Sequence, residues 1–466
     1  MKSIESSAGE ATLRTSLRFA CTLALVMAFA GLFAGSASAQ WTETTISSLN
    51  NDLPFYPNYP PYAVFDTAGN LYGVIEGTIY KLSPTPGGGA WTETVLYTFP
   101  RSDYSINGEL IFDAAGNLYG TTQFGGNAAV TCDLVENPPQ GPGCGMVFKL
   151  TPTASGPWTE TVLYEFGGAD DGGWPRSGVT FDRAGNLYGT TSAAGAGLVG
   201  VVYKLTPTAT GPWTQSLLYT FCPGQGLCPD GAAPFTGVTF DNIGNLYGTV
   251  DDSDPDGASG VFKLTLRPNG SWKEELIALI PDSTGEAEPL ASLKFRPTRD
   301  RCVRDVDREN DRGRRRDARR DEICGEFYGT SRLGGPDGIG DVFRVRPTEG
   351  GVWEEAEIYD FQTTDGRAPT SAVVFDDAGN LYGTTVWGGT KDAGCLDPGC
   401  GVVFELTPTP TPPWTYSLIY NFPGGTQVGW PGGLSFGPDG NLYGPSCDAV
   451  GVFELTPPAA TAALNK

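Results

Sequence analysis

The chain has 466 residues, of which 39% are hydrophobic, 65 are glycine and 37 are proline, and its net charge is −23. It contains no histidine, which excludes Ser-His-Asp and Cys-His catalysis and histidine-ligated metals, and removes the usual general base near neutral pH. The excess of acidic residues repels phosphate groups, so it argues against binding to nucleic acids and to anionic lipid surfaces. Many glycines and prolines favour turns over helices.

The N-terminus has the features of an export signal. Three basic residues are followed by an uncharged, mostly apolar run that ends in the small residues Ser36–Ala39, as in a cleavable secretory signal peptide. We therefore expect residues 1–39 to be removed and the mature chain to begin at Gln40 with a net charge of −24. The alternative is an uncleaved membrane anchor, for which the apolar run is short.

A repeat unit then accounts for most of the chain, and the copy at 177–221 shows its parts in order. A short strand ends at Phe181, and the Asp-x-x-Gly-Asn sequence at Asp182–Asn186 has the chemistry of a tight turn. The four expected strands are residues 177–181, 187–191, 200–205 and 213–221. Four short strands with one apolar face are not stable alone, so successive copies must pack face to face.

Seven copies of the Tyr-Gly hairpin and seven Trp-led strands occur, but their phases differ. The first Trp-led strand, Trp41–Ser48, precedes the first hairpin, and no such strand follows Leu455. We therefore expect the N-terminal strand to complete the last repeat and close a ring without open sheet edges. The prediction is an all-β, seven-bladed β-propeller of four-stranded antiparallel blades over residues 40–457, followed by a tail at 458–466. A linear β-solenoid is the alternative, and the split repeat disfavours it.

Loops make the average repeat, 427 residues over seven blades or about 61 each, longer than the roughly 40–50 residues of familiar propeller repeats. The second-to-third-strand loops and the blade-to-blade connections share one rim, here called the upper face, and most long Gly-rich insertions fall there. A different insertion, at residues 296–321, interrupts the first hairpin of the fifth blade and is dense in Arg and Asp. We expect it to be a disordered or locally helical excursion from the lower face.

The repeat resembles the GloVer tandem repeat of exported bacterial proteins, often called choice-of-anchor proteins. The motifs that carry the resemblance are Phe-Asp-x-x-Gly-Asn-Leu-Tyr-Gly-Thr-Thr, Gly-Val-Val-Phe-Lys-Leu-Thr-Pro and Trp-Thr-Glu-x-x-Leu-Tyr-x-Phe, over nearly all of Trp41–Pro457. The resemblance implies an extracellular repeat protein and identifies no catalytic residue. The interrupted fifth blade and the lack of an obvious anchor after Leu455 depart from the family pattern.

The cysteines agree with export. Three pairs lie close together within single loops, and a fourth pair brackets the charged insertion, so we expect four disulfides rather than zinc ligands. The expected pairs are Cys132/Cys144, Cys222/Cys228, Cys302/Cys324 and Cys395/Cys400. Cys447 is left without an assigned partner. We expect the protein outside the cell, on the cell surface or in the periplasm, as a monomer.

Candidate metal ligands occur in the upper loop of the fourth blade. Asp252, Asp254 and Asp256 alternate before a glycine, as in short Asp-x-Asp-x-Asp-Gly calcium loops, although no carboxylate stands at the twelfth position of an EF-hand loop. The alternative is a solvated acidic loop.

Three blade-to-blade connections share an Asp-Gly start and a nearby proline. Their aspartates, Asp171, Asp230 and Asp365, are expected near the upper end of the central channel, where converging carboxylates act as acid and base on a glycoside or bind a cation. The alternative, favoured here, is that each aspartate caps its turn by accepting backbone amides.

Three of the ten tryptophans stand outside the repeat strands: Trp174, Trp387 and Trp430. All three fall in upper-face loops, and the last two are expected to be neighbours. Exposed aromatic rings on one rim suit stacking against sugars or anchoring a protein partner, whereas capping of the blade interfaces is the structural alternative.

These observations favour a non-enzymatic extracellular propeller that binds a glycan or a protein through its upper face. A secreted carboxylate-dependent carbohydrate-active hydrolase or lyase is the second hypothesis, and a structural cell-surface module is the third. No cofactor other than calcium is indicated.

Overall fold

The computed structural model describes residues 41–48, 62–75, 77–86, 90–99, 106, 108–127, 129–130, 132, 143–154, 156–196, 199–222, 228–251, 259–281, 287–299, 301–305, 322–390, 399–423, 430–446 and 451–458. Within these ranges the chain forms strands and turns and no helix. The predicted signal peptide, the tail from residue 459 onwards and Cys447 lie outside the described residues. No helix in the described part is long and apolar enough to cross a membrane.

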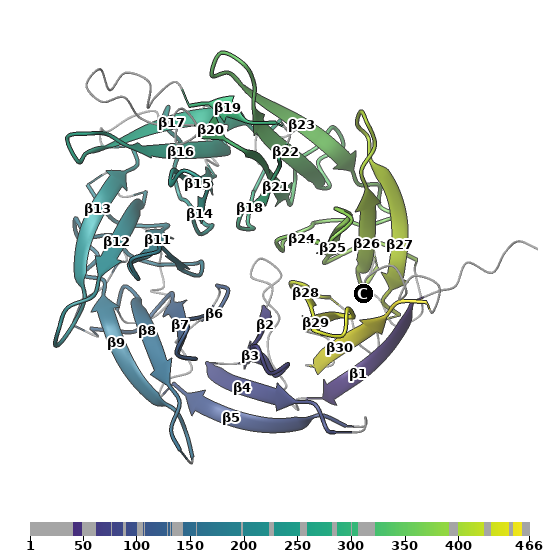
Figure 1. Ribbon diagram of the computed structural model, residues 1–466, viewed down its shortest axis with the longest axis horizontal. Coiled ribbons are helices and arrows are strands. Elements are labelled where there is room, and N and C mark those ends of the chain that lie inside the picture. Colours follow the sequence, from purple (N-terminus) through teal and green to yellow (C-terminus); the bar gives the residue numbers. More distant parts are fainter. Residues whose placement is uncertain are drawn as a thin grey trace, which may run out of the picture.

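Seven four-stranded antiparallel sheets surround a central axis as the blades of a propeller (Figure 1), which confirms the predicted fold. In blades 1 to 6 the strands follow chain order from the axis outwards. Blades 1 to 4 consist of β2 (Ala63–Phe65), β3 (Leu71–Ile75), β4 (Thr78–Ser83) and β5 (Thr92–Thr98); β6 (Ile111–Phe112), β7 (Leu118–Thr122), β8 (Met146–Thr151) and β9 (Thr159–Glu165); β10 (Thr180–Phe181), β11 (Leu187–Thr191), β12 (Val201–Thr206) and β13 (Thr214–Thr220); and β14 (Thr239–Phe240), β15 (Leu246–Val250), β16 (Gly260–Leu266) and β17 (Trp272–Leu279). Blades 5 to 7 consist of β18 (Lys294–Pro297), β21 (Gly325–Ser331), β22 (Asp341–Pro347) and β23 (Trp353–Asp360); β24 (Val374–Phe375), β25 (Leu381–Thr385), β26 (Val402–Thr407) and β27 (Thr415–Asn421); and β28 (Ser435–Phe436), β29 (Leu442–Ser446), β30 (Gly451–Thr456) and β1 (Thr42–Ser48).

The N-terminal strand closes the ring as predicted. β1 pairs antiparallel with β30 from Thr42 opposite Thr456 to Ser48 opposite Gly451, with a register shift next to Ile46. Ile46 is buried in the interface between blades 7 and 1. Because β1 is the fourth strand of blade 7, this blade has four strands like the other six, and the outer edge of β30 is paired.

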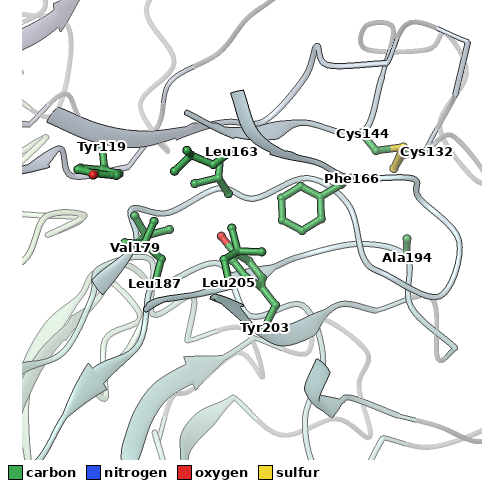
Figure 2. Packing of buried hydrophobic residues seen from close by; sticks show 11 residues of the cluster. Tyr119, Cys132, Cys144, Leu163, Phe166, Val179, Leu187, Ala194, Tyr203 and Leu205 are labelled. Atoms are coloured by element: carbon green, nitrogen blue, oxygen red, sulfur yellow. A yellow bond between two sulfur atoms is a disulfide. The ribbon is translucent and has the colours of Figure 1, made fainter. Parts of the chain in front are cut away.

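The core consists of seven hydrophobic clusters, one in each interface between neighbouring blades. Figure 2 shows the cluster between blades 2 and 3, in which Leu163 and Phe166 of one blade pack on Leu187 and Tyr203 of the next. Burial between blades rather than within a blade explains why a single repeat is not a stable unit.

The repeated Asp, Asn and Tyr form one hydrogen-bonded turn in every hairpin except that of blade 5, where Glu326 accepts from Tyr328 instead. In blade 3 the Asp182 carboxylate accepts the backbone N–H groups of Ala184 and Asn186, the Asn186 side-chain amide at 2.7 Å and the Tyr188 hydroxyl at 3.0 Å. Burial would raise the pKa of Asp182, but these four hydrogen bonds outweigh it and lower the pKa. In the last blade Asp439 takes over the bonds to Asn441 and Tyr443 from a position two residues later.

The Tyr of this turn also joins neighbouring blades. Its ring packs edge to face on the Phe of the next blade's inner strand and beside the Trp that leads the next blade's outer strand. For Tyr119 these partners are Phe181, at a centroid distance of 5.0 Å, and Trp213, at 6.4 Å. The Trp, Tyr and Phe of the repeat are therefore mainly interface residues.

The structure describes the base of the insertion in blade 5. This base is a two-stranded hairpin, β19 (Val303–Arg304) and β20 (Glu322–Ile323), clipped by the Cys302–Cys324 disulfide. Asp305 lies against blade 4, where its carboxylate pairs with Lys263 at 2.7 Å while both side chains are at most 3% exposed. One carboxylate of the insertion thus neutralises a buried lysine of the neighbouring blade, which charge density alone did not indicate. Residues 306–321 lie outside the described ranges.

The disulfides Cys132–Cys144, Cys222–Cys228 and Cys302–Cys324 are confirmed. Cys400 is also disulfide-bonded, while its predicted partner Cys395 lies outside the described residues. Disulfides form and persist in oxidising compartments, so these bonds are compatible with an extracellular protein.

Candidate functional site on the upper face

The connections between blades present equivalent residues on the upper face. In five of them the residue before a proline has a positive φ of 40–57°, an uncommon conformation for a residue with a side chain. Backbone bonds hold it: the Trp174 N–H donates to Cys144 O at 2.9 Å and the Trp430 N–H donates to Cys400 O at 2.8 Å. The five equivalent residues are Trp174, Ala233, Glu288, Ala368 and Trp430.

The structure brings Trp387 and Trp430 together, as predicted. Their ring centroids are 5.3 Å apart at an interplanar angle of 68°, and both side chains are partly exposed. Trp387 is fixed by a pair of backbone hydrogen bonds with Arg367, of 2.8 and 3.0 Å. The pair is therefore an edge-to-face aromatic surface on a rigid backbone between blades 6 and 7.

Trp174 does not join that pair but has an aromatic partner of its own. The rings of Phe124 and Trp174 are 6.1 Å apart at 79°, between blades 2 and 3. Sequence reasoning missed Phe124, although a signal was present: it stands two residues after the Gly-Thr-Thr of its blade, as Trp387 does in blade 6. The upper face thus carries two equivalent aromatic pairs at different positions around the ring. In the Phe124–Trp174 pair, Phe124 is more buried than Trp174.

Side chains occupy the upper mouth of the central channel. Lys294 of blade 5 donates to both carboxylate oxygens of Glu109, which precedes the inner strand of blade 2, at 2.9 and 3.1 Å. The Arg176 guanidinium lies over the Phe235 ring, 4.9 Å from its centroid. The cavity among these residues has a volume of about 20 Å³, which holds about one water molecule. A larger ligand would therefore contact the upper rim rather than this cavity.

The structure does not bring Asp171, Asp230 and Asp365 together at the channel, so that prediction of convergence is wrong. Each aspartate lies beside the outer strand of its own blade and accepts one tyrosine hydroxyl and one backbone N–H. The donors are Tyr164 and Gly167 for Asp171, Tyr219 and Cys222 for Asp230, and Tyr359 and Gln362 for Asp365. This is the turn-capping arrangement, and it uses the carboxylates to fix the connections.

The predicted calcium ligands Asp252, Asp254 and Asp256 lie outside the described residues. At the base of the insertion, the ligand atoms of Cys302, Glu322 and Cys324 lie close enough together to hold a metal ion. Both sulfurs of that group are in a disulfide, so they do not ligate a metal as thiolates.

The connection capped by Asp230 also contacts an acidic residue on the following blade, because the Tyr219 hydroxyl hydrogen-bonds to Glu274. Burial, with a further contribution from Asp230, raises the pKa of Glu274 on β17 to about 7. Because the folded protein binds this proton more tightly than the unfolded chain, Glu274 should lower stability progressively as pH rises from about 4.5 through 7.

We therefore expect Glu274→Gln to raise the free energy of unfolding by about 1 kcal/mol at pH 8 and to leave it nearly unchanged at pH 4.5. Thermal unfolding at both pH values measures this, with Glu275→Gln, whose side chain is 44% exposed, as the matched control. An equal gain at both pH values would show that the effect does not come from the titration of Glu274.

The fold and its repeated hairpins define a seven-bladed propeller built from tandem repeats. The chain belongs to the Gloeobacter/Verrucomicrobia repeat family, whose sequence profile matches residues 59–297. No curated protein matches the chain.

Solved propellers resemble the structure at low identity. They include virginiamycin B lyase from Staphylococcus aureus, with 14% identity over 90% of this chain and 99% of that one and a TM-score of 0.48. A family AA12 carbohydrate-active enzyme from Trichoderma reesei has 13% identity over 90% and 96%, with a TM-score of 0.41. The PQQ-bound aldose sugar dehydrogenase from Streptomyces coelicolor has 10% identity over 90% and 99%, with a TM-score of 0.40. These values are too low to carry any of the three activities to this chain.

Proposed function

We propose that the protein is an extracellular, non-enzymatic binding protein that holds a glycan against the aromatic side chains of its upper face. The observation that carries the proposal is the Trp387–Trp430 pair, two partly exposed indoles 5.3 Å apart on backbone that is hydrogen-bonded in place. Indole faces stack on the C–H faces of sugar rings, and a ring that is already held loses little conformational entropy on binding.

Export of the chain is part of the proposal. The signal-like N-terminus and the disulfides support it, because disulfides persist in oxidising compartments. The net negative charge supports a neutral or cationic ligand over a nucleic acid. A monomer is sufficient for this function, since the aromatic pair belongs to one chain.

The enzymatic alternative has less support. A glycosidase needs two carboxyl groups on either side of the scissile bond, and Asp171, Asp230 and Asp365 lie in three separate connections with one oxygen each bonded to a tyrosine. The binding proposal therefore assigns them no catalytic role. A protein ligand or a purely structural module remains as an outcome of the experiment below.

The test is a glycan and polysaccharide array probed with mature protein and with the Trp387→Ala/Trp430→Ala variant. We expect reproducible binding by the wild type and, for the variant, a Kd about thirtyfold weaker, corresponding to about 2 kcal/mol for lost aromatic contacts. Val352→Ala, at an apolar residue that is 65% exposed on the fourth-strand side of blade 5, is the control and should bind like the wild type. Silence of the wild type across the array would refute glycan binding and favour a protein ligand or a structural role.

A further inference from the structure

Blade 5 places two carboxylates in a row where the other blades have at most one, Glu165 of blade 2. β21 ends at Ser331, β22 begins at Asp341 and β23 ends at Asp360. Ser331 is paired with Asp341 and Asp341 with Asp360, and side chains of directly paired residues lie on the same face of a sheet. The three residues therefore form one row at the upper end of the blade. The equivalent rows are Thr191, Val201 and Thr220 in blade 3, and Thr385, Val402 and Asn421 in blade 6.

Ser331 and Asp341 of this row are buried, Asp360 is partly exposed, and the row has no neutralising partner among the described residues. Asp341 is 1% exposed and Ser331 is fully buried. Oδ1 of Asp341, Oδ1 of Asp360 and Oγ of Ser331 are all buried and form no well-directed hydrogen bond. None of the ion pairs among the described residues includes either aspartate. A buried carboxylate without compensation costs several kcal/mol.

The other buried carboxylates of the described chain show how the fold normally satisfies such groups. Each of them has a side-chain partner: Asp241 has Asn245 and Tyr247, Asp251 has Ser259, Asp305 has Lys263, and Glu326 has Tyr328. Asp341 has only the neighbouring Ser331 hydroxyl, without a well-directed bond to its Oδ1, so an additional positively charged partner would complete the site.

The upper loop of blade 5 lies directly on this row. A Cβ atom built on Gly334 would lie 3.0 Å from Oδ2 of Asp341, and one built on Gly335 would collide with Oδ1 of Asp360. Gly335 has a φ of +80°, so glycine permits both the backbone conformation and the close approach. The loop backbone and the two carboxylates therefore enclose the same small space.

Blade 6 shows what the row looks like when it is satisfied within the protein. There Asn421 Oδ1 accepts the backbone N–H of Thr390 at 2.7 Å. The residue of blade 5 at the position of Thr390 is Pro336, which has no N–H, and the residue at the position of Asn421 is Asp360. Blade 5 has thus lost the loop donor and gained two negative charges at one place.

We propose that Asp341, Asp360 and the hydroxyl of Ser331 hold a hard divalent cation of the calcium class beneath the upper loop of blade 5. Calcium takes six to eight oxygen ligands from carboxylates, hydroxyls, backbone carbonyls and water, and it tolerates irregular geometry. Its charge would neutralise the buried carboxylate of Asp341 and the partly exposed carboxylate of Asp360. This site is separate from the Asp252 loop and does not depend on glycan binding.

The test uses the mature protein after treatment with a chelator and exchange into metal-free buffer. Calorimetric titration with calcium chloride, and separately with magnesium chloride, should show one site in which Asp341→Asn/Asp360→Asn weakens the Kd at least tenfold. The cation should raise the Tm of the wild type but not of that variant. In chelator, the variant should unfold at the same temperature as the wild type or higher, because it has lost unpaired buried charge, and this shows that it folds.

A second variant separates the two acidic loops. Asp252→Asn/Asp254→Asn/Asp256→Asn should retain the site and the cation-dependent rise in Tm. The proposal is overturned if neither cation binds the wild type, if binding is unchanged in Asp341→Asn/Asp360→Asn, or if the Asp252-loop variant alone abolishes it.

Discussion

A chain that lacks residues 41–48 should fail to form a stable monomeric propeller. The deletion removes β1 and therefore all its pairs with β30, buried Ile46 and the contact of Trp41 with Tyr382, whose ring centroids are 6.2 Å apart. Lost burial alone should cost on the order of 5 kcal/mol. The exposed edge of β30 should then pair with other molecules. We expect a Tm at least about 15 °C lower, or aggregation, in thermal unfolding and size-exclusion chromatography.

Point variants test the same closure at constant length. Ile46→Asp places a charge in the interface between blades 7 and 1 and should cost about 3 kcal/mol or more. Thr44→Asp introduces the same charge two residues away on an exposed side chain and should change stability by less than about 0.5 kcal/mol. Equal, small effects of both variants would contradict the assignment of β1 to the last blade.

The second large effect is expected at the Gly of the Tyr-Gly pair. A Cβ atom on Gly189 would collide with the hydroxyl of Tyr203 and lie 2.7 Å from its Cζ, and Tyr203 is fully buried. Gly189→Ala should therefore lower the free energy of unfolding by about 3 kcal/mol through overpacking against Tyr203 on the neighbouring strand of the same blade.

The matched control is the same methyl group added at Gly185, in the preceding turn. That glycine has a φ of +81° but nothing lies within 4 Å of its Cβ position, so Gly185→Ala should cost only about 1 kcal/mol for the backbone conformation. Urea unfolding of the two variants measures the difference. If Gly185→Ala lowered the free energy of unfolding more than Gly189→Ala, the close packing of Gly189 on Tyr203 would not be the reason that glycine is required at position 189.

The fold was predictable because its determinants repeat. The Asp182 turn, the Tyr188 ring and the Trp213 strand each recur at fixed spacing, and the phase of the Trp strands implied closure by Trp41. The pairing of nearby cysteines was equally local. The proximity of Trp387 and Trp430 followed from their places in one blade and the next connection, and the structure confirms it.

What the sequence did not indicate depended on contacts that have no local signal. Asp171 was expected near the channel because its connection leads there, but it follows the outer strand by only a few residues and bonds back to Tyr164 of that strand. Asp305 reaches Lys263 of another blade across 42 positions of sequence. The Asp341–Asp360 row becomes visible only when the strand register is known. Asp341 begins the first strand of a hairpin and Asp360 ends the second, so the two are paired in space but distant in sequence.

The central functional claim is that the Trp387–Trp430 pair is the glycan-binding surface. The most direct measurement is an equilibrium titration of the strongest array ligand into three proteins: wild type, Trp387→Ala/Trp430→Ala and Phe124→Ala/Trp174→Ala. Each protein is measured at the same number of degrees below its own Tm. We predict about 2 kcal/mol weaker binding when the first pair is removed, with a smaller loss from the second pair because Phe124 is already buried. Wild-type affinity in the Trp387→Ala/Trp430→Ala protein would contradict the claim.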